Sequence, residues 1–456
     1  MGSDSGVSPL MEQVSRYVAE TLVRPLPAEV IEKAKHHLLD TVAAMLSGAT
    51  LAPGKSAISY VSTLGGTPEA CVAGTRIVTS IANAAFANGM LAHADETDDS
   101  HQPGFCHPGC AVIPAALAMG ERERRSGADF LRAIVAGYDI GPRITMALGG
   151  MHFHNSGHAT HSFAGIFGAA VAAGVLAGLD ATGIRYVLSY AAQQASGVSC
   201  WMRDSDHIEK AFDFGGMPAQ HGVAAAAMVA HGFTGLADVF SGDRNFFEAF
   251  GVSDPQRLVE GLGERYEIAH SNIKKWPVGS PIQAALDSVE TLMRENKNLS
   301  AGDVDHINVH IQDHEAAVVD DREMPDISLQ HMVALLLVDG HVGFESSHDM
   351  ARLDDPAVAS LRERVKLTPS PELTTQGGRR AIVEIYRRDS ATPLRTVSSA
   401  VRGTADNPMS REEVVEKADD LITLVLGAQR ARDVIDCFMN IEEVGDMRDV
   451  RPVLQA

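Results

Sequence analysis

The sequence predicts a mainly α-helical protein made of a large helical domain and a smaller α+β domain. Its 456 residues are two to three times the length of a typical domain. From about residue 10 to residue 270, alanine-rich stretches place apolar residues three and four positions apart, with breaks at Gly or Pro. After Lys274 the pattern changes to short segments that alternate or carry β-branched residues, separated by turn-forming residues.

Several helices of the first part carry clear start, stop or burial signals. Ser126-Gly-Ala-Asp129 is an N-capping sequence, and the apolar residues that follow it fall on one helical face. A second helix is expected from about residue 218 to 231, ending before Gly232. Residues 165–179 are almost all Gly, Ala, Val, Leu and Ile, which predicts a helix buried on every side.

The second part is expected to form a small antiparallel sheet with a helical segment between its strands. The expected strands are residues 304–311, 365–367, 381–387 and 395–401, and the expected helix is about 328–338. Ser410-Arg-Glu-Glu413 is a capping box ahead of the last helices, which we expect to rejoin the first domain. The predicted domains are therefore residues 1–270 completed by 406–456, and residues 271–405.

Composition and charge exclude several classes of partner. Hydrophobic residues make up 45% and charged residues 21%, and no apolar run reaches the ~18 residues of a membrane-spanning helix, so we expect a soluble protein. The formal net charge of −21 would repel nucleic acid and anionic membranes. An anionic metabolite still fits a cleft in which a few cationic side chains converge.

Cysteine usage and the N-terminus favour the cytoplasm. The five cysteines are odd in number and scattered, which fits a reducing compartment better than a disulfide framework. The first residues, Met-Gly-Ser-Asp-Ser-Gly, lack the basic and apolar regions of a secretory signal.

The segment from His93 to His107 is the densest group of titratable residues in the chain. It places four carboxylates beside three imidazoles, a crowding that costs stability unless cations or buried hydrogen bonds compensate it. Such crowding moves pKa values toward the range used in acid–base catalysis. A solvated acidic loop with a histidine N-cap explains the same residues, and the segment alone does not separate the two interpretations.

Other histidines and lysines add candidates. His152, His154, His158 and His161 precede the buried helix, so the last of them are expected near its N-terminus, where anions are favoured. Lys210 and Lys274 occur in glycine- and proline-marked contexts, and a lysine in a cleft pairs with a substrate carboxylate. Each of these residues also has an ordinary interpretation, as a polar loop histidine or a surface lysine.

The sequence matches none of the common metal-binding or nucleotide-binding motifs. His101, Cys106, His107 and Cys110 match no zinc-finger spacing, the chain has no His-Glu-x-x-His helix, and Pro108-Gly109 indicates a turn. Neither a Gly-x-x-x-x-Gly-Lys loop nor a Gly-x-Gly-x-x-Gly turn after a strand is present. We therefore expect no metal and no cofactor.

Taken together, these segments resemble the MmgE/PrpD family, which includes 2-methylcitrate dehydratase, cis-aconitate decarboxylase and iminodisuccinate epimerase. The likeness extends over nearly the whole chain. Its markers are residues 40–44, the 93–108 block, Gly137-Tyr138-Asp139, Gly157-His158 with residues 165–170, Lys210, residues 274–277, residues 328–340 and Asn407-Pro408-Met409-Ser410.

The resemblance implies a fold, an assembly and a site. It implies a large helical domain formed by the N-terminal half and the last helices, an inserted α+β lid domain, a homodimer, and a cofactor-free site at the domain boundary. Three matching positions depart from the family pattern: Glu96 replaces Asp, Ser100 replaces Thr and His331 replaces Tyr. The site residues implied are Glu96, Ser100, His107, His158, Lys210, Lys274 and His331, with Asp95 or Asp99 as alternative acids.

The resulting hypothesis is a lyase, either a dehydratase or a decarboxylase, for a small polycarboxylate of the 2-methylcitrate or cis-aconitate type. In it, Lys210 and Lys274 hold carboxylates, together with Ser100 and His331. His107 or His158 transfers a proton next to a carboxylate, with the other histidine, Glu96 or Asp99 as the acid. The alternatives are a two-base epimerase of an iminodisuccinate-like dicarboxylate, a histidine-rich metal hydrolase and a non-catalytic binding protein.

Overall fold

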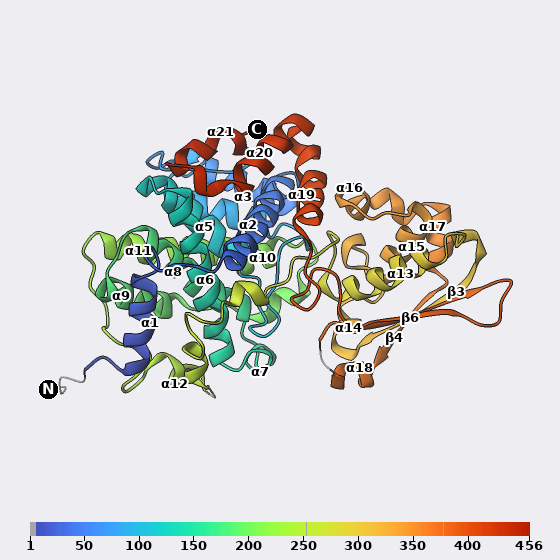
Figure 1. Ribbon diagram of the computed structural model, residues 1–456, viewed down its shortest axis with the longest axis horizontal. Helices are drawn as coiled ribbons and strands as arrows, with labels where there is room; N and C mark the ends of the chain where they lie inside the picture. The colour runs from blue at the N-terminus through green and yellow to red at the C-terminus, as the bar shows by residue number, and fades with distance from the viewer. Residues whose placement is uncertain (1–5, 252, 377) are drawn as a thin grey trace. The chain divides into compact units, whose positions relative to one another are not determined.

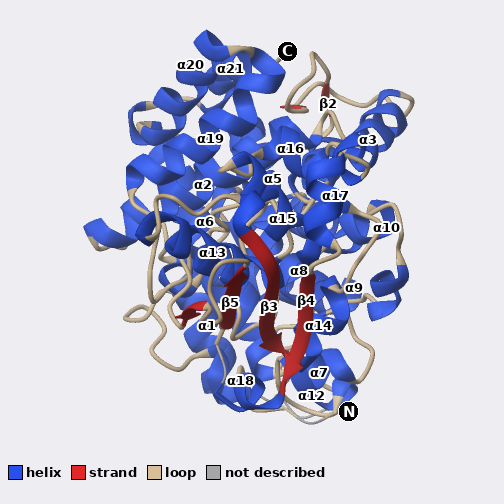
Figure 2. Cartoon of the chain, turned by 90° about the vertical axis from the view of Figure 1, so that its right-hand side faces the viewer, coloured by secondary structure: helices blue, strands red, loops and turns tan. Residues whose placement is uncertain are grey.

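The computed structural model describes residues 6–251, 253–376 and 378–456, and it is mainly α-helical with small β-sheets (Figures 1 and 2). The chain forms two compact units. Unit 1 contains the chain up to Asn272 together with Val414–Ala456, and unit 2 is Ile273–Glu413. The polypeptide returns to unit 1 at Val414, whereas the sequence pattern placed the return at residue 406. Arg402 pairs with Glu413 in this stretch and ties it to unit 2.

Unit 1 is built around α8 (Thr160–Leu176), whose residues are all buried. This confirms the expected helix without a polar face. Small residues let the neighbouring helices approach closely: a Cβ atom added at Gly222 would lie 2.5 Å from the Cβ of Ala169. The helices that pack against α8 are α5 (Gly109–Glu123), α6 (Gly127–Ala147), α9 (Ala181–Gln194) and α11 (Met217–Ala230). α4 (Ile81–Ala92) packs against α5 and α11.

The remaining elements of unit 1 follow the predicted end signals. The Ser126 side chain accepts a hydrogen bond from the backbone N–H of Asp129 at the start of α6. Ser410 and Glu413 form the expected capping box at the start of α19 (Arg411–Leu426). The other helices are α1 (Pro9–Ala19), α2 (Ala28–Gly48), α3 (Ala52–Ser62), α7 (Met151–Asn155), α10 (Ile208–Ala211), α12 (Phe246–Phe250), α20 (Ala428–Met439) and α21 (Arg451–Leu454).

A buried ion pair attaches the C-terminal helices to the rest of unit 1. Figure 1 shows α19 close to α2, although the two lie at opposite ends of the sequence. The ammonium group of Lys417 on α19 donates to Asp40 Oδ1 at 2.6 Å and to the carbonyl oxygen of Thr97 at 2.9 Å. Burial raises the pKa of Asp40 to about 6, although Lys417 acts in the opposite direction. Lys417 therefore joins α2, α19 and the 93–107 segment.

The sheet of unit 2 is mixed rather than antiparallel. Its strand order is β4-β3-β5-β6, with β3 (Val304–Gln312), β4 (Val365–Ser370), β5 (Ala381–Arg387) and β6 (Leu394–Ser398) (Figure 2). β5 pairs antiparallel with β3 and β6, but β3 and β4 are parallel, so the expectation of a purely antiparallel sheet was wrong for this pair. A long connection lies between β3 and β4 and lets β4 run parallel beside β3. It contains α14 (Asp313–Val319), α15 (Leu329–Asp339), α16 (Phe344–His348) and α17 (Pro356–Arg362).

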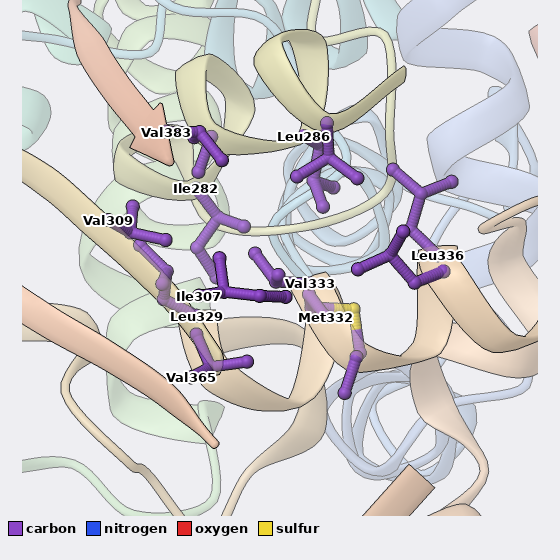
Figure 3. Close-up of a cluster of buried hydrophobic side chains, with 14 of the residues drawn as sticks. Ile282, Leu286, Ile307, Val309, Leu329, Met332, Val333, Leu336, Val365 and Val383 are labelled. Atoms are coloured by element: carbon purple, nitrogen blue, oxygen red, sulfur yellow. The ribbon is translucent and has the colours of Figure 1, made fainter. Parts of the chain in front are cut away.

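The core of unit 2 lies between this sheet and two helices. Figure 3 shows Ile307, Val309 and Val365 of the strands facing α15 and Leu286 of α13 (Gln283–Glu295). The buried apolar positions of β3 are Val304, Ile307, Val309 and Ile311. The irregular register between Val304 and His306 accounts for the three-residue spacing between the first two.

A two-stranded ribbon in unit 1 was not predicted. It pairs β1 (Ala70–Cys71) antiparallel with β2 (Val78–Thr79). Two residues per strand are too few to produce a detectable period. Within the described parts of the chain, no helix is sufficiently long and apolar to cross a membrane.

The Lys417 anchor gives a stability prediction. Lys417→Met leaves the buried Asp40 carboxylate without its cation, and we expect the free energy of unfolding at pH 8 to fall by about 3–5 kcal/mol. Asp40 already has a folded-state pKa above its ordinary value, so protonation favours the folded state. The loss should therefore be smaller at pH 5, as measured by urea unfolding.

Lys35→Met is the matched control because Lys35 of α2 pairs with Glu442 at 2.7 Å in a more exposed setting. We expect a change of at most about 1 kcal/mol for this surface pair. Equal losses for the two variants, or a loss for Lys417→Met that grows at pH 5, would contradict the assignment.

Candidate active site

The acid- and histidine-rich segment lies between α4 and α5 and is buried. Asp95 and Glu96 are 5% and 6% exposed, and Asp98 and Asp99 are 0% exposed. The interpretation as a solvated acidic loop was therefore wrong. Four buried carboxylates require donors or cations as partners, and those partners define the site.

Asp98 supports the imidazole of His107. His107 Nδ1 lies 3.1 Å and 3.2 Å from the two carboxylate oxygens of Asp98. His93 Nδ1 is 3.0 Å from Asp98 Oδ2, within ion-pair distance but outside hydrogen-bonding geometry. The side chain of His107 is 11% exposed, whereas that of Asp98 is fully buried. A carboxylate on Nδ1 fixes the tautomer so that Nε2 exchanges protons, the arrangement typical of a general acid or base.

Aromatic rings pack around this pair. The Phe214 ring stacks on His161 at 3.7 Å and on His93 at 4.3 Å between centroids. His161, near the start of α8, lies 5.2 Å from the His107 ring. Burial, with His107 adding to it, lowers the pKa of His161 well below its ordinary value. His161 is thus a neutral imidazole in van der Waals range of His107.

His158, the histidine favoured from the sequence, lies in a different environment. Its ring stacks on Phe153 at 4.3 Å and makes edge contacts with Phe163 and Phe250. Among the described residues, the structure brings His161 rather than His158 into ring contact with His107. The sequence placed both in one cluster near the N-terminus of α8 but could not indicate which ring turns toward the acidic segment.

Lys210 and Glu96 form the second part of the site. The Lys210 ammonium donates to Glu96 Oε1 and lies over the rings of Trp201 and Phe214, at 5.5 Å and 5.3 Å from their centroids. His207 Nδ1 is 3.9 Å from the same Glu96 oxygen. Burial and the charge of Lys210 lower the pKa of His207 to about 3. Sequence reasoning missed His207, although its position three residues before Lys210 was an available signal.

An irregular helical turn positions Phe214. Residues Phe212–Gly216 form a π-helical turn between α10 and α11, a feature that often occurs at functional sites. A Cβ atom on Gly215 would lie 2.1 Å from the carbonyl oxygen of Gly89 on α4. Glycine at both positions therefore lets the turn press Phe214 against the histidines.

Asp99 is held by three donors. Tyr138 Oη donates to Asp99 Oδ2 at 2.5 Å, His37 Nδ1 lies 2.6 Å from the same oxygen, and the Gly109 N–H donates to Oδ1 at 3.0 Å. These contacts link α2, α5 and α6 through one carboxylate. Asp99 accepts hydrogen bonds that hold three helices together, which is a structural role. A catalytic role for Asp99 stays a prediction.

Ser100 differs from its acidic neighbours. Its backbone pairs with Asn272 in both directions, at 2.9 Å and 2.7 Å. Its Oγ is buried and has no hydrogen-bond partner among the described residues. A buried hydroxyl without a partner is able to bind a ligand atom, and the substrate contact expected for Ser100 stays a prediction.

The last two expected residues belong to unit 2. Lys274 is 2% exposed, close to the start of the unit. His331 on α15 is fully buried, and neither ring nitrogen has a hydrogen-bond partner among the described residues. Burial, together with Arg362 and Arg352, lowers the pKa of His331 to about 4, so the imidazole is neutral near pH 7. The structure brings Glu96, His107 and Lys210 together within unit 1.

Two groups of side chains are compact enough to be tested as metal ligands. His93, Asp98 and Cys110 form one, and His93, Glu96 and His207 form the other, with ligand atoms within 4.8 Å of one another. Burial raises the pKa of the Cys110 thiol well above its ordinary value, so it stays protonated. The Lys210 ammonium holds Glu96 in the second group. Neither group is a ready set of anionic ligands, and we assign no metal to either.

A buried carboxylate-supported imidazole and a nearby lysine, in a mainly helical unit, define a candidate acid–base site. The chain belongs to the MmgE/PrpD family: residues 12–258 match the MmgE/PrpD N-terminal domain and residues 276–442 match the MmgE/PrpD C-terminal domain.

Relatives of known description extend over nearly the full length of the chain. A cis-aconitate decarboxylase-like protein from Aspergillus oryzae is 25% identical, with 96% of this chain and 95% of the relative covered. A cis-aconitate decarboxylase from Aspergillus terreus is 24% identical, with 99% of this chain and 96% of the relative covered.

The role of Asp99 gives a second prediction. Tyr138→Phe removes a hydrogen bond to a buried carboxylate, and we expect the free energy of unfolding to fall by about 1.5–3 kcal/mol. Tyr190→Phe is the control because Tyr190 donates to the carbonyl oxygen of Thr234 at an exposed position, where about 1 kcal/mol or less is expected. If thermal and urea unfolding find Tyr138→Phe as stable as the wild type, Asp99 is not the structural centre described.

Proposed function

We propose that the protein is a metal- and cofactor-independent lyase that acts on a small polycarboxylate of the 2-methylcitrate or cis-aconitate type. The observation that carries the proposal is the Asp98–His107 pair beside Lys210 in a buried site. The names of the relatives favour decarboxylation over dehydration. A homodimer in the cytoplasm is the setting we propose for it.

Electrostatic stabilisation is the main task of such a site. Loss of CO₂, or removal of a proton next to a carboxylate, leaves an electron pair that spreads into the neighbouring carboxylate. A fixed cation in a water-poor site stabilises that charge by several kcal/mol. Lys210 supplies one cation, and we assign Lys274 the same task for a second carboxylate. The hydroxyl of Ser100 and the imidazole of His331 are assigned to further substrate contacts.

Proton transfer is assigned to His107. In a decarboxylation, the C–C bond breaks, CO₂ leaves, the electron pair stays on the substrate carbon, and protonated His107 delivers its proton there. His107 then regains a proton from water, and Asp98 stabilises its protonated form. In a dehydration, neutral His107 instead removes the proton, and His158, Glu96 or Asp99, in its protonated form, delivers a proton to the departing hydroxyl.

An epimerase of an iminodisuccinate-like dicarboxylate is the second candidate. Such an epimerase removes a proton from one face of the substrate carbon and returns one on the other face, with His107 as one of the two groups. The two candidates use the same acidic segment and differ in the product.

Proton NMR in D₂O tests the proposal. The protein is incubated separately with cis-aconitate, trans-aconitate, citrate, 2-methylcitrate and iminodisuccinate, with and without EDTA. On at least one acid we expect either CO₂ loss with one deuterium incorporated at the protonated carbon, or water elimination, in both cases with no effect of EDTA. Deuterium wash-in with inversion and no elimination product would establish the epimerase, and inertness toward all five acids would exclude the substrate class.

The Asp98–His107 pair gives a kinetic prediction. Asp98→Asn removes the charge that stabilises protonated His107, so we expect kcat to fall by about 10²- to 10⁴-fold. KM should change little, because Asp98 is fully buried behind His107.

The control for this variant is a second buried carboxylate–imidazole pair, in which His101 Nε2 lies 3.1 Å from Glu267 Oε2. Glu267→Gln should lower stability while the folded fraction keeps its kcat. A kcat for Asp98→Asn within threefold of the wild type would rule out the assigned role of Asp98.

A further inference from the structure

The cation proposed to bind substrate already holds a carboxylate of the protein. Lys210 donates to Glu96 Oε1, and Glu96 is 6% exposed. A substrate carboxylate that binds Lys210 must therefore compete with Glu96. Removing one partner of a buried ion pair is strongly unfavourable unless the other partner finds a replacement. The structure must then offer the Glu96 carboxylate a second hydrogen-bond donor.

His207 is close enough to be that donor. It immediately precedes α10, on which Lys210 lies, and its Nδ1 is 3.9 Å from the oxygen that Lys210 holds. It is 7% exposed, and its Nε2 has no hydrogen-bond partner among the described residues. His207 also has φ of 64°, a left-handed conformation that costs energy in a non-glycine residue and tends to occur at functional sites.

The charges around His207 suit this role. Lys210 and His93 disfavour its protonated form, whereas Glu96 and Asp95 favour it, and burial is the largest effect. Asp204 lies at the start of the same turn and accepts from the Lys210 N–H at 2.9 Å. A neutral imidazole has one N–H, which can donate a hydrogen bond to the Glu96 carboxylate without adding a buried cation.

We propose that Glu96 is an internal competitor for Lys210, and that a substrate carboxylate displaces it from Lys210 onto His207. This inference rests on the proposed function, because it takes Lys210 as the carboxylate-binding residue. His207 is then a positioning residue, which acts through Glu96.

The exchange selects for polycarboxylates. A monocarboxylate only replaces the contact that Glu96 already makes, so it gains little. A di- or tricarboxylate displaces Glu96 with one carboxylate and makes additional contacts with the others. Ligands of this class should therefore bind much more tightly than acetate or propionate.

A double-mutant cycle tests the exchange, with tricarballylate, a saturated tricarboxylate, as the probe in isothermal titration calorimetry. Glu96→Gln removes the competing charge, so we expect tricarballylate to bind about tenfold more tightly or better, since hydrogen bonds to charged groups are about twice as strong as neutral ones. His207→Asn removes the second donor for Glu96 and should weaken binding about three- to tenfold. In the Glu96→Gln background, His207→Asn should have no effect.

A spectroscopic readout reports on His207 in the folded protein directly. The side-chain ¹⁵N resonances of His207 should shift on addition of tricarballylate to the wild type and should stay in place in Glu96→Gln. Weaker or unchanged binding by Glu96→Gln, or equal effects of His207→Asn in both backgrounds, would overturn the exchange alone. If neither the wild type nor Glu96→Gln binds tricarballylate, the exchange and the proposed function both fail.

Discussion

The burial of four carboxylates in one short segment is the constraint on which the rest of unit 1 depends. Two are matched from outside the segment, Asp99 by Tyr138, His37 and Gly109, and Glu96 by Lys210. The other two are matched within it, Asp98 by His107 and Asp95 by Thr97. Because α2, α5, α6, α10 and α19 all supply a partner to this segment or its backbone, the site also holds the helices together.

Helix positions were predictable from the sequence because local signals determine them. The Ser126 and Ser410 caps and the apolar run of α8 act within a few residues, so spacing alone identified them. Strand direction was not predictable in the same way. β4 is parallel to β3 because of the path of the long helical connection between them. The alternation of residues within the two strands does not indicate that path.

The candidate site was predictable as a segment but not as a set of contacts. The crowding of acids and histidines identified residues 93–107, and the family resemblance added Lys210. The choice between His158 and His161 depends on which ring faces Phe214, and that follows from the packing of the π-helical turn against Gly89. His207 is a similar case, since its role depends on a distance to Glu96 across 111 residues of sequence.

The proposed polyanionic substrate must bind to a strongly acidic protein. With a net charge of −21, the long-range field opposes an anionic ligand, so attraction must be short-range and buried. Burial keeps His161 and His207 neutral, which leaves Lys210 as the ammonium at this cluster in the described part of unit 1. An ammonium left open there would bind any small anion. Under the proposed exchange, pairing Lys210 with Glu96 raises the threshold for binding, so that a ligand with several carboxylates is favoured.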